Sequence, residues 1–572
     1  MSRRQASLLI LILVLLPLFP YGQVWHFSFL NLDDDSYISK VPQLLQGYSW
    51  ESWRWAWTTA DPFIMPVVRL ALIGEIALFG LDSGWIHGIN LFYHMANVFL
   101  LFALLHRLTG DFWPSWLAAA WFALHPQHVE AVAWAAERKE VMSAFFGLLS
   151  LWCYVSYCQT SHHPRRWYGF SLLFLLLSLL CKPMWVTMPV LLLWLDYYPL
   201  QRYGLGMVPL LREKLPFLLV GMLVSFLTLF TFHQGGHLTS LHVLPLVNRL
   251  SNVLAGYMGY VFNTLWPVHL GLPYRASPDL PEWTTIAGQL LFLATLSWLA
   301  WHNRQKHPML LVGWGWFLVA ILPVSGLLEG GQPLLMADRR SYVPHMLLLP
   351  ALVWLLPMRK AVLAGAMVFL LISGWLTADY ASRWRDSITL WSTFISQNFD
   401  ANFARWALSM ALAEENRLEE AITTVHEAHR QDPQEAVYIR TLADFLEKSG
   451  KINQAWQVRQ FLTQTNSPTT LQTLKETGLA AFTANRHQDA ILLLGSYWQK
   501  VQVHDLLAAY ALGVSLHEDG QSKSALDLWQ DYLREEPVHR MEKCRLFLEL
   551  SGHPTPPQPA WAKEQWTRLC GK

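Results

Sequence analysis

Apolar residues form long uninterrupted runs in the first two thirds of the chain, whereas polar residues break them up in the last third. A straight helix needs roughly 20 apolar residues to cross the hydrocarbon core. Some of the runs are shorter than that, but together they predict an all-α polytopic membrane helix bundle of about 11 spans over residues 1–379. The runs cover residues 8–24, 85–105, 112–125, 140–158, 167–181, 184–198, 215–233, 284–301, 308–325, 343–357 and 361–378.

Basic residues in short turns predict which ends of the spans face the cytoplasm. The first run follows Arg3 and Arg4, and we expect it to be retained as a span because residues 17–21 make a poor signal-peptide cleavage site. The topology places the C-terminal half outside the cytoplasm if residues 245–270 form a re-entrant or interfacial helix. If that polar stretch crosses the membrane, the C-terminal half changes sides. The turns in question contain Arg107, Arg165, Arg166, Arg202, Arg212, Lys214, Arg304, Lys306, Arg359 and Lys360.

Residues 380–572 carry an internal repeat. Ala421, Ala455, Ala490 and Ala525 are 34, 35 and 35 residues apart. A period near 34 with small residues where two helices touch is typical of tetratricopeptide repeats. We therefore predict a tetratricopeptide-repeat α-solenoid, an architecture whose concave face usually binds proteins and carries out no chemistry.

Composition supports a membrane protein and excludes two other classes. Hydrophobic residues make up 53% of the chain and charged residues only 15%, which argues against disorder and against a fully soluble enzyme. A formal net charge of +1 gives no basic field for nucleic acid. The five cysteines form no metal-binding spacing, and only Cys544 and Cys570 would suit a disulfide, on an extracytoplasmic tail.

Three consecutive carboxylates, Asp33, Asp34 and Asp35, follow the first span. Crowded acids repel one another, so at least one pKa should rise, as a general base near neutrality requires. Oxygen ligands of this kind also suit a divalent cation, and a solvated helix N-cap is the structural alternative. The same loop continues with several tryptophans, suited to the membrane interface or to stacking on sugars, and with Arg69.

Further polar groups appear at the same predicted face of the membrane. His87 begins a helix face that continues through Asn90, His94 and Asn97, and polar groups on a membrane helix usually point into the bundle. The second predicted outside loop contains His125, His128 and Glu130, which could bind a metal but lack the spacing of a zinc protease, so no metal ligand set is assigned. It ends at Arg138 and Lys139, suited either to a phosphate or to anchoring at headgroup depth. Two later outside segments contribute Lys182, Asp338, Arg339 and Arg340.

Acids and bases from four separate loops thus converge on one membrane face. The blocks around them, residues 123–154 (ALHPQHVEAVAWAAERKEVMSAFFGLLSLWCY), 181–200, 337–344 (ADRRSYVP) and 382–394, precede the repeat. In this order they resemble the transmembrane and tetratricopeptide-repeat O-mannosyltransferases, more closely their bacterial relatives, which belong to the GT-C class of glycosyltransferases. The family usually has Tyr after the Asp-Arg of the last loop, where this chain has Arg340.

The resemblance implies inverting transfer of a sugar from a polyprenyl-phosphate donor to a hydroxyl, at the outer face of a bacterial inner membrane. It matches the family's paired acids to Asp33–Asp34 or Asp34–Asp35, and we expect Asp34 to be the catalytic base. Arg138, Lys139, Lys182, Arg339 and Arg340 would hold the donor phosphate. His87, His125, His128, Glu130 and Arg69 would bind substrate, and the repeats a protein acceptor. The alternative function is a non-catalytic scaffold that recruits envelope proteins through its repeats.

Overall fold

The computed structural model describes residues 2–58, 64–160, 163–234, 245–272, 274–277, 279–327, 334–397, 401–464, 471–501 and 506–534. The chain divides into two compact units, Met1–Asp400 and Ala401–Lys572. Cys544 and Cys570 lie outside the described residues, so their pairing stays a prediction. Cys153, Cys158 and Cys181 are free thiols within the first unit.

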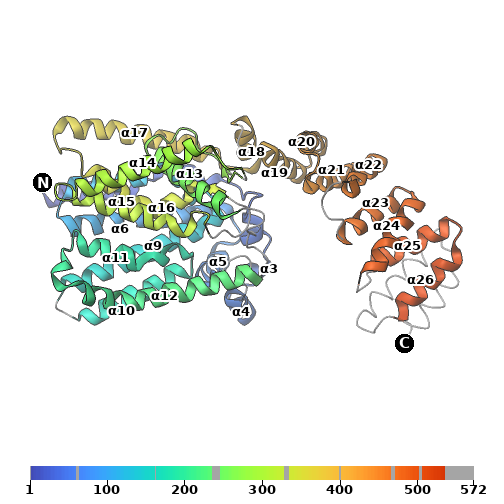
Figure 1. Cartoon of the computed structure of the whole chain (residues 1–572), viewed down its shortest axis with the longest axis horizontal. Coiled ribbons are helices and arrows are strands. Elements are labelled where there is room, and N and C mark those ends of the chain that lie inside the picture. Colours follow the sequence, from blue (N-terminus) through green and yellow to red (C-terminus); the bar gives the residue numbers. More distant parts are fainter. Residues whose placement is uncertain are drawn as a thin grey trace. The chain divides into compact units, whose positions relative to one another are not determined.

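The first unit is a helix bundle (Figure 1). Prolines stand at the first turn of several helices, where the missing N–H costs nothing, and Gly80 and Gly110 end two helices with positive φ angles of 75° and 78°. A short antiparallel pair, β1 (Tyr274–Arg275) and β2 (Leu334–Met336), joins two of its loops. The helices are α1 (Arg3–Leu15), α2 (Leu18–Tyr21), α3 (Pro42–Leu45), α4 (Trp50–Thr58), α5 (Pro66–Phe79), α6 (Ser83–Thr109), α7 (Phe112–Ala123), α8 (Val129–Ala133), α9 (Arg138–Gln159), α10 (Pro164–Leu179), α11 (Met188–Tyr197), α12 (Met207–Gln234), α13 (Leu246–Leu265), α14 (Trp283–His302), α15 (Pro308–Ile321), α16 (Tyr342–Val353), α17 (Lys360–Ser382) and α18 (Ser387–Ser396).

Six helical segments among the described residues are long and apolar enough to cross a membrane. The other predicted spans correspond to the shorter helices α7, α10, α11, α15 and α16, so the count of 11 is not confirmed. Residues 245–270 contain one continuous helix, α13, which is not among the six and packs against α14 and β2. The six segments are Arg3–His26, Ser83–Thr109, Ala135–Gln159, Met207–Gln234, Trp283–His302 and Lys360–Ser382.

The loops with the predicted site residues gather at one end of this unit. Helices α6, α9 and α16 begin there, and α10, α12 and α15 end there. In Figure 1 the short helices α3, α4 and α5 mark this end, opposite the N-terminus. The direction of these helices therefore carries residues from six separate segments to one place.

A second group of charges closes the opposite end of α9, α11 and α12. Asp196 contacts Lys214 and Arg202 at 2.5 and 2.9 Å, and Glu213 contacts the same two cations at 3.0 and 2.8 Å. The Tyr154 hydroxyl donates to Asp196 at 2.8 Å. We call this arrangement the Asp196 cluster (Tyr154, Asp196, Arg202, Glu213 and Lys214). Its two carboxylates neutralise its two cations.

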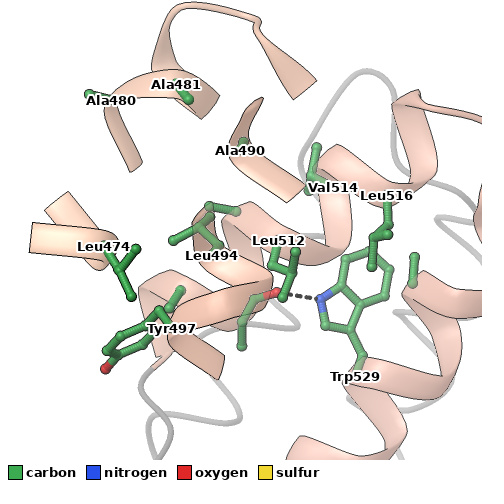
Figure 2. Packing of buried hydrophobic residues seen from close by; sticks show 14 of the residues in the cluster. Leu474, Ala480, Ala481, Ala490, Leu494, Tyr497, Leu512, Val514, Leu516 and Trp529 are labelled. Atoms are coloured by element: carbon green, nitrogen blue, oxygen red, sulfur yellow. Dashed lines mark hydrogen bonds between the residues drawn. The ribbon is translucent and has the colours of Figure 1, made fainter. Parts of the chain in front are cut away.

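The second unit is a series of helix pairs, and each helix packs on its neighbour in the sequence. Ala421, Ala455, Ala490 and Ala525 are fully buried in the second helix of each pair, as the repeat spacing predicts. Figure 2 shows the last pairs, where Trp529 packs among Leu512 and Leu516 and its indole N–H donates to the Ala509 carbonyl at 2.9 Å. The assignment to tetratricopeptide repeats stays a prediction. These helices are α19 (Ala401–Glu414), α20 (Leu418–Gln431), α21 (Ala436–Lys448), α22 (Ile452–Gln464), α23 (Leu471–Thr483), α24 (His487–Lys500), α25 (Leu506–Glu518) and α26 (Ser522–Arg534).

The units meet at residue 400, whereas the sequence-based boundary stands at residue 379. The difference arises from α18, which belongs to the first unit. Its Trp391 is buried and donates to the Asn31 side chain at 2.8 Å, and Asn31 lies in the first loop of the bundle. The segment after the last predicted span is therefore anchored beside the aspartate triplet.

Candidate functional site

A cavity of about 530 Å³ lies where the loops gather. One part of its wall is charged, with Asp33, Glu137, Lys139, Lys182, Arg339 and Arg340. The rest is largely apolar and is built from the end of α12 and two loops, with Pro183, Met184, Val186, Leu229, Phe232, Leu322, Pro323, Val324 and Leu327. The cavity thus offers a cationic wall and an apolar wall to a single ligand.

Glu137 is the centre of the charged wall. Its carboxylate lies 3.1 Å from the Lys139 ammonium, 3.0 Å from Lys182 and 3.1 Å from the Arg339 guanidinium. It is buried, so these cations replace the water it would otherwise need. The ion pairs hold three cations from three segments at one edge of the cavity.

Two further acids and two rings fix those cations from behind. Lys182 also contacts Glu140 at 2.6 Å, and Glu130 accepts hydrogen bonds from the Arg339 side chain and, at 2.8 Å, from its backbone N–H. The Lys139 ammonium lies 4.6 Å from the centre of the Tyr37 ring, and the Arg339 guanidinium lies 5.2 Å from that of Trp134. Such contacts restrict the side chains before any ligand binds.

Arg340 differs from the other cations of the wall. Its guanidinium donates to the Val324 carbonyl at 2.8 Å, and no carboxylate of the described residues forms an ion pair with it. It lines the cavity, so it is a cation whose charge can be matched by a ligand. This is also the residue that departs from the family pattern.

The three aspartates face three different environments. Asp34 is fully buried, and its two oxygens accept the backbone N–H groups of Leu30 and Ala136, both at 2.8 Å. Burial raises the pKa of Asp34 to about 7, although the two backbone hydrogen bonds oppose the shift. Its hydrogen bonds tie the first loop to the second, and it does not line the cavity.

Asp35 is partly exposed and pairs with Lys40 at 2.7 Å, while its other oxygen accepts the Ser39 hydroxyl. Asp33 is the member of the triplet that lines the cavity. Asp34 and Asp35 are not among the residues that line it, and the assignment of Asp34 as the base stays a prediction. The carboxylates of Asp34 and Asp35 have separate partners and do not converge on one cation site.

Two residues predicted to bind phosphate or substrate, Arg138 and Arg69, line a neighbouring cavity of about 290 Å³. The guanidinium of Arg138, however, is buried against Glu75, the Asn90 side chain and, at 2.7 Å, the Ile86 carbonyl. Arg69 is buried over the Trp55 ring at 5.2 Å. Neither side chain reaches the larger cavity, whereas Tyr37 lines both.

The predicted histidines are buried and lie outside both cavities. His87 packs edge-on against Phe27 at a ring distance of 5.9 Å. His125 and His128 lie together within the second loop, with their ring centres 5.4 Å apart, and Glu130 accepts a hydrogen bond from Arg339. None of these four residues lines the larger cavity.

Sequence reasoning missed several groups of the wall. Glu137 stands directly before Arg138 and Lys139 but was not assigned a role, although a carboxylate next to two cations is a usable signal. Tyr37 and the α12 residues Ser225, Thr228 and Phe232 carried no chemical signal, because an apolar run does not show which of its residues line a cavity.

Comparisons with known proteins are consistent with the resemblance over part of the chain. No family model matches the chain. It is 35% identical over 107 residues to the Protein O-mannosyl-transferase TMTC2 of Mus musculus and to that of Homo sapiens, a match covering 19% of this chain and 13% of each relative. It is 40% identical over 81 residues to the Xenopus laevis Protein O-mannosyl-transferase tmtc2, covering 14% of this chain and 10% of that relative. The chain is therefore similar, over a small part of its length, to proteins named as O-mannosyl-transferases.

Proposed function

We propose that this chain is a membrane glycosyltransferase that moves a sugar, of which mannose is the first candidate, from a lipid-phosphate donor to a hydroxyl acceptor on a protein. The observation that carries the proposal is the larger cavity, whose wall is cationic on one side and apolar on the other. A polyprenyl-phosphate sugar has the same division, with an anionic phosphate between a sugar and a hydrocarbon chain. The partial similarity to O-mannosyl-transferases supports the same class of reaction.

The charges of the wall suit a phosphate that gains charge as it leaves. Lys139, Lys182 and Arg339 are already held in place by acids, so they need little reorganisation during the reaction. Arg340 adds a cation without an acidic partner among the described residues. We assign the donor phosphate to this edge, with Arg340 as its principal partner.

Asp33 is the proposed base. It would remove the proton of the acceptor hydroxyl as that oxygen attacks the anomeric carbon, while the bond from that carbon to the phosphate oxygen breaks and the lipid phosphate leaves with the electron pair. The sugar passes through an oxocarbenium-like state. Asp33 is preferred to Asp34 because both oxygens of Asp34 are engaged by backbone N–H groups, whereas Asp33 faces the cavity.

The second unit is proposed to hold the acceptor. In this proposal its helix pairs are tetratricopeptide repeats, and the cavity opens at the outer face of a bacterial inner membrane. The buried alanines at the repeat spacing support the assignment to tetratricopeptide repeats. No metal is needed for the reaction as proposed.

The test uses the purified full chain in vesicles that contain polyprenyl-phosphate [³H]mannose, with membrane proteins from a host lacking this gene as acceptors. Asp33→Asn should lower the rate of label transfer roughly 10²–10⁴-fold, the usual loss of a general base. Asp35→Asn is the matched control, because Asp35 faces Lys40 and not the cavity, and it should change the rate less than about 3-fold. Full transfer by the Asp33 variant would remove Asp33 from the role of base, whereas no transfer by the unmodified chain would favour the scaffold function instead.

A further inference from the structure

We propose that His125, His128 and His345 form a binding site for a transition-metal ion of the zinc class, separate from the glycosyltransferase cavity. One ring nitrogen of each histidine lies within 4.8 Å of one from each of the other two. All three side chains are fully buried, between the second loop and α16. Imidazole nitrogens are ligands that Zn²⁺ and its neighbours prefer, and three of them commonly form such a site.

The outer partners of two histidines fix the direction of their lone pairs. His128 Nδ1 lies 2.7 Å from the Phe122 carbonyl, and His125 Nε2 lies 3.0 Å from the Thr264 carbonyl. A carbonyl only accepts hydrogen bonds, so both of these nitrogens must carry protons. The other nitrogen of each neutral ring then offers a lone pair. Metal-binding histidines are usually oriented by this kind of bond to a carbonyl.

The third histidine follows the same logic through a threonine. The Thr264 hydroxyl donates to the Tyr260 carbonyl at 2.6 Å, which uses its one proton. His345 Nε2, 2.9 Å from the same hydroxyl oxygen, must therefore donate to it. His345 Nδ1 is left with a lone pair, and it faces the lone pair of His128 Nε2 at a distance of 3.0 Å.

Two facing lone pairs need a positive charge between them, either a shared proton or a metal ion. The metal ion is favoured because a third ring, His125, belongs to the same cluster, and its Nδ1 accepts only a long 3.2 Å hydrogen bond from the Gln127 backbone. A shared proton would use two of the three rings. Zinc with Zn–N bonds of about 2.0–2.1 Å holds its ligands about 3.3 Å apart, so the close pair would open slightly on binding.

A buried acid nearby would balance the ion's charge. Asp338 is fully buried, and it accepts hydrogen bonds from the Gln127 side chain at 3.3 Å and from the Tyr274 hydroxyl at 3.2 Å. Within the described residues no lysine or arginine forms an ion pair with it. A cation held by the three histidines, one residue away through Gln127, would supply the missing positive charge.

The ion would be structural. It would join the second loop to α16. The Glu130–Arg339 pair already connects the second loop to the residues just before α16. Because it binds the folded chain, it should also raise the thermal stability of that chain. It does not touch the proposed reacting atoms, so it is independent of the proposed function.

The experiment uses the full chain in detergent, stripped with a chelator and titrated with Zn²⁺. We expect one zinc ion per chain, an X-ray absorption spectrum with three imidazole ligands at about 2.0–2.1 Å, and a higher melting temperature with zinc than without it. His128→Gln should weaken zinc binding at least 100-fold, beyond the usual loss for an outer-shell residue. His94→Gln is the matched control, because His94 is equally buried 6.3 Å from the His128 ring but is outside the cluster.

The spectrum of the unmodified chain keeps the test decisive if the His128 variant fails to fold. Failure of the unmodified chain to bind zinc, or bound zinc without imidazole ligands, would overturn the proposal in favour of a shared proton. Equal zinc binding by the His128 and unmodified chains would overturn it as well.

Discussion

Two buried charge clusters lie at opposite ends of the same bundle and differ in what surrounds them. Both hold carboxylates between lysine and arginine side chains from separate segments, with contacts of 2.5–3.1 Å. The Asp196 cluster matches two acids with two cations and faces no described cavity. The Glu137 wall opens onto about 530 Å³ of space and includes Arg340, a cation without a carboxylate partner among the described residues.

The difference shows that buried charge alone does not indicate a catalytic site. A closed set of ion pairs fastens helices together, whereas a set with an open face and an unmatched cation can receive an anionic ligand. Three substitutions and one pH titration test this distinction.

The largest expected effect is at the closed cluster. Lys214→Met leaves Asp196 fully buried without one of its two cations, so we expect the free energy of unfolding to fall by about 3–5 kcal/mol. Transfer activity per folded molecule should not change. Thermal unfolding in detergent measures the first effect, and Lys306→Met, at an exposed position, is the control.

At the open wall we expect a large effect on donor binding and a small effect on stability, the reverse of the closed cluster. Arg340→Gln removes the cation assigned to the donor phosphate, and such charged hydrogen bonds contribute about 1.5–3 kcal/mol, so KM for the lipid donor should rise roughly 10–100-fold. Stability should change by less than about 0.5 kcal/mol. Arg385→Gln, in an exposed ion pair, should alter neither quantity. An unchanged KM would remove Arg340 from the donor site.

A pH titration can test the raised pKa of Asp34, a buried acid without an ion pair among the described residues. The folded-state pKa of Asp34 is raised to about 7 from an ordinary value of 3.8. Its protonated form is therefore favoured on folding, and the stability it contributes is present below pH 4 and is lost as pH rises to about 7. Between pH 5.5 and 8 the loss should be roughly 2 kcal/mol. Asp34→Asn should lack this part of the pH dependence of thermal unfolding, and an identical slope in both chains would contradict the raised pKa.

The smallest effect is expected at the exposed pair beside the open wall. Lys40 is 61% exposed and Asp35 31% exposed, so water screens their contact. Lys40→Met should change the free energy of unfolding by less than about 0.5 kcal/mol and the transfer rate by less than about 2-fold. If Lys40→Met impaired sugar transfer as much as Arg340→Gln, proximity to the cavity would matter more than burial and pairing.

Much of the open wall could be predicted from the sequence. Arg339, Arg340, Lys139 and Lys182 were identified because charged residues at the ends of apolar runs have few reasons to occur there. The direction of the helices then brings their ends together. The repeat alanines were predictable for a similar reason, since close helix contacts tolerate only small side chains.

The orientation of adjacent side chains could not be predicted. Asp33 and Asp34 are equivalent in the sequence, and only the hydrogen bonds from Leu30 and Ala136 decide which of them turns inward. Arg138 and Lys139 are equally alike, but Glu75 and Asn90 hold Arg138 away from the larger cavity. His345 lies in an apolar run with no local signal, and its pairing with His128 connects residues 217 positions apart.

Tyr37 lines both cavities, and the Lys139 ammonium rests on its ring. One aromatic side chain is consequently common to the walls of both chambers. A change in the volume of residue 37 should therefore alter both chambers at once, whereas a change at a residue that lines only one of them should not.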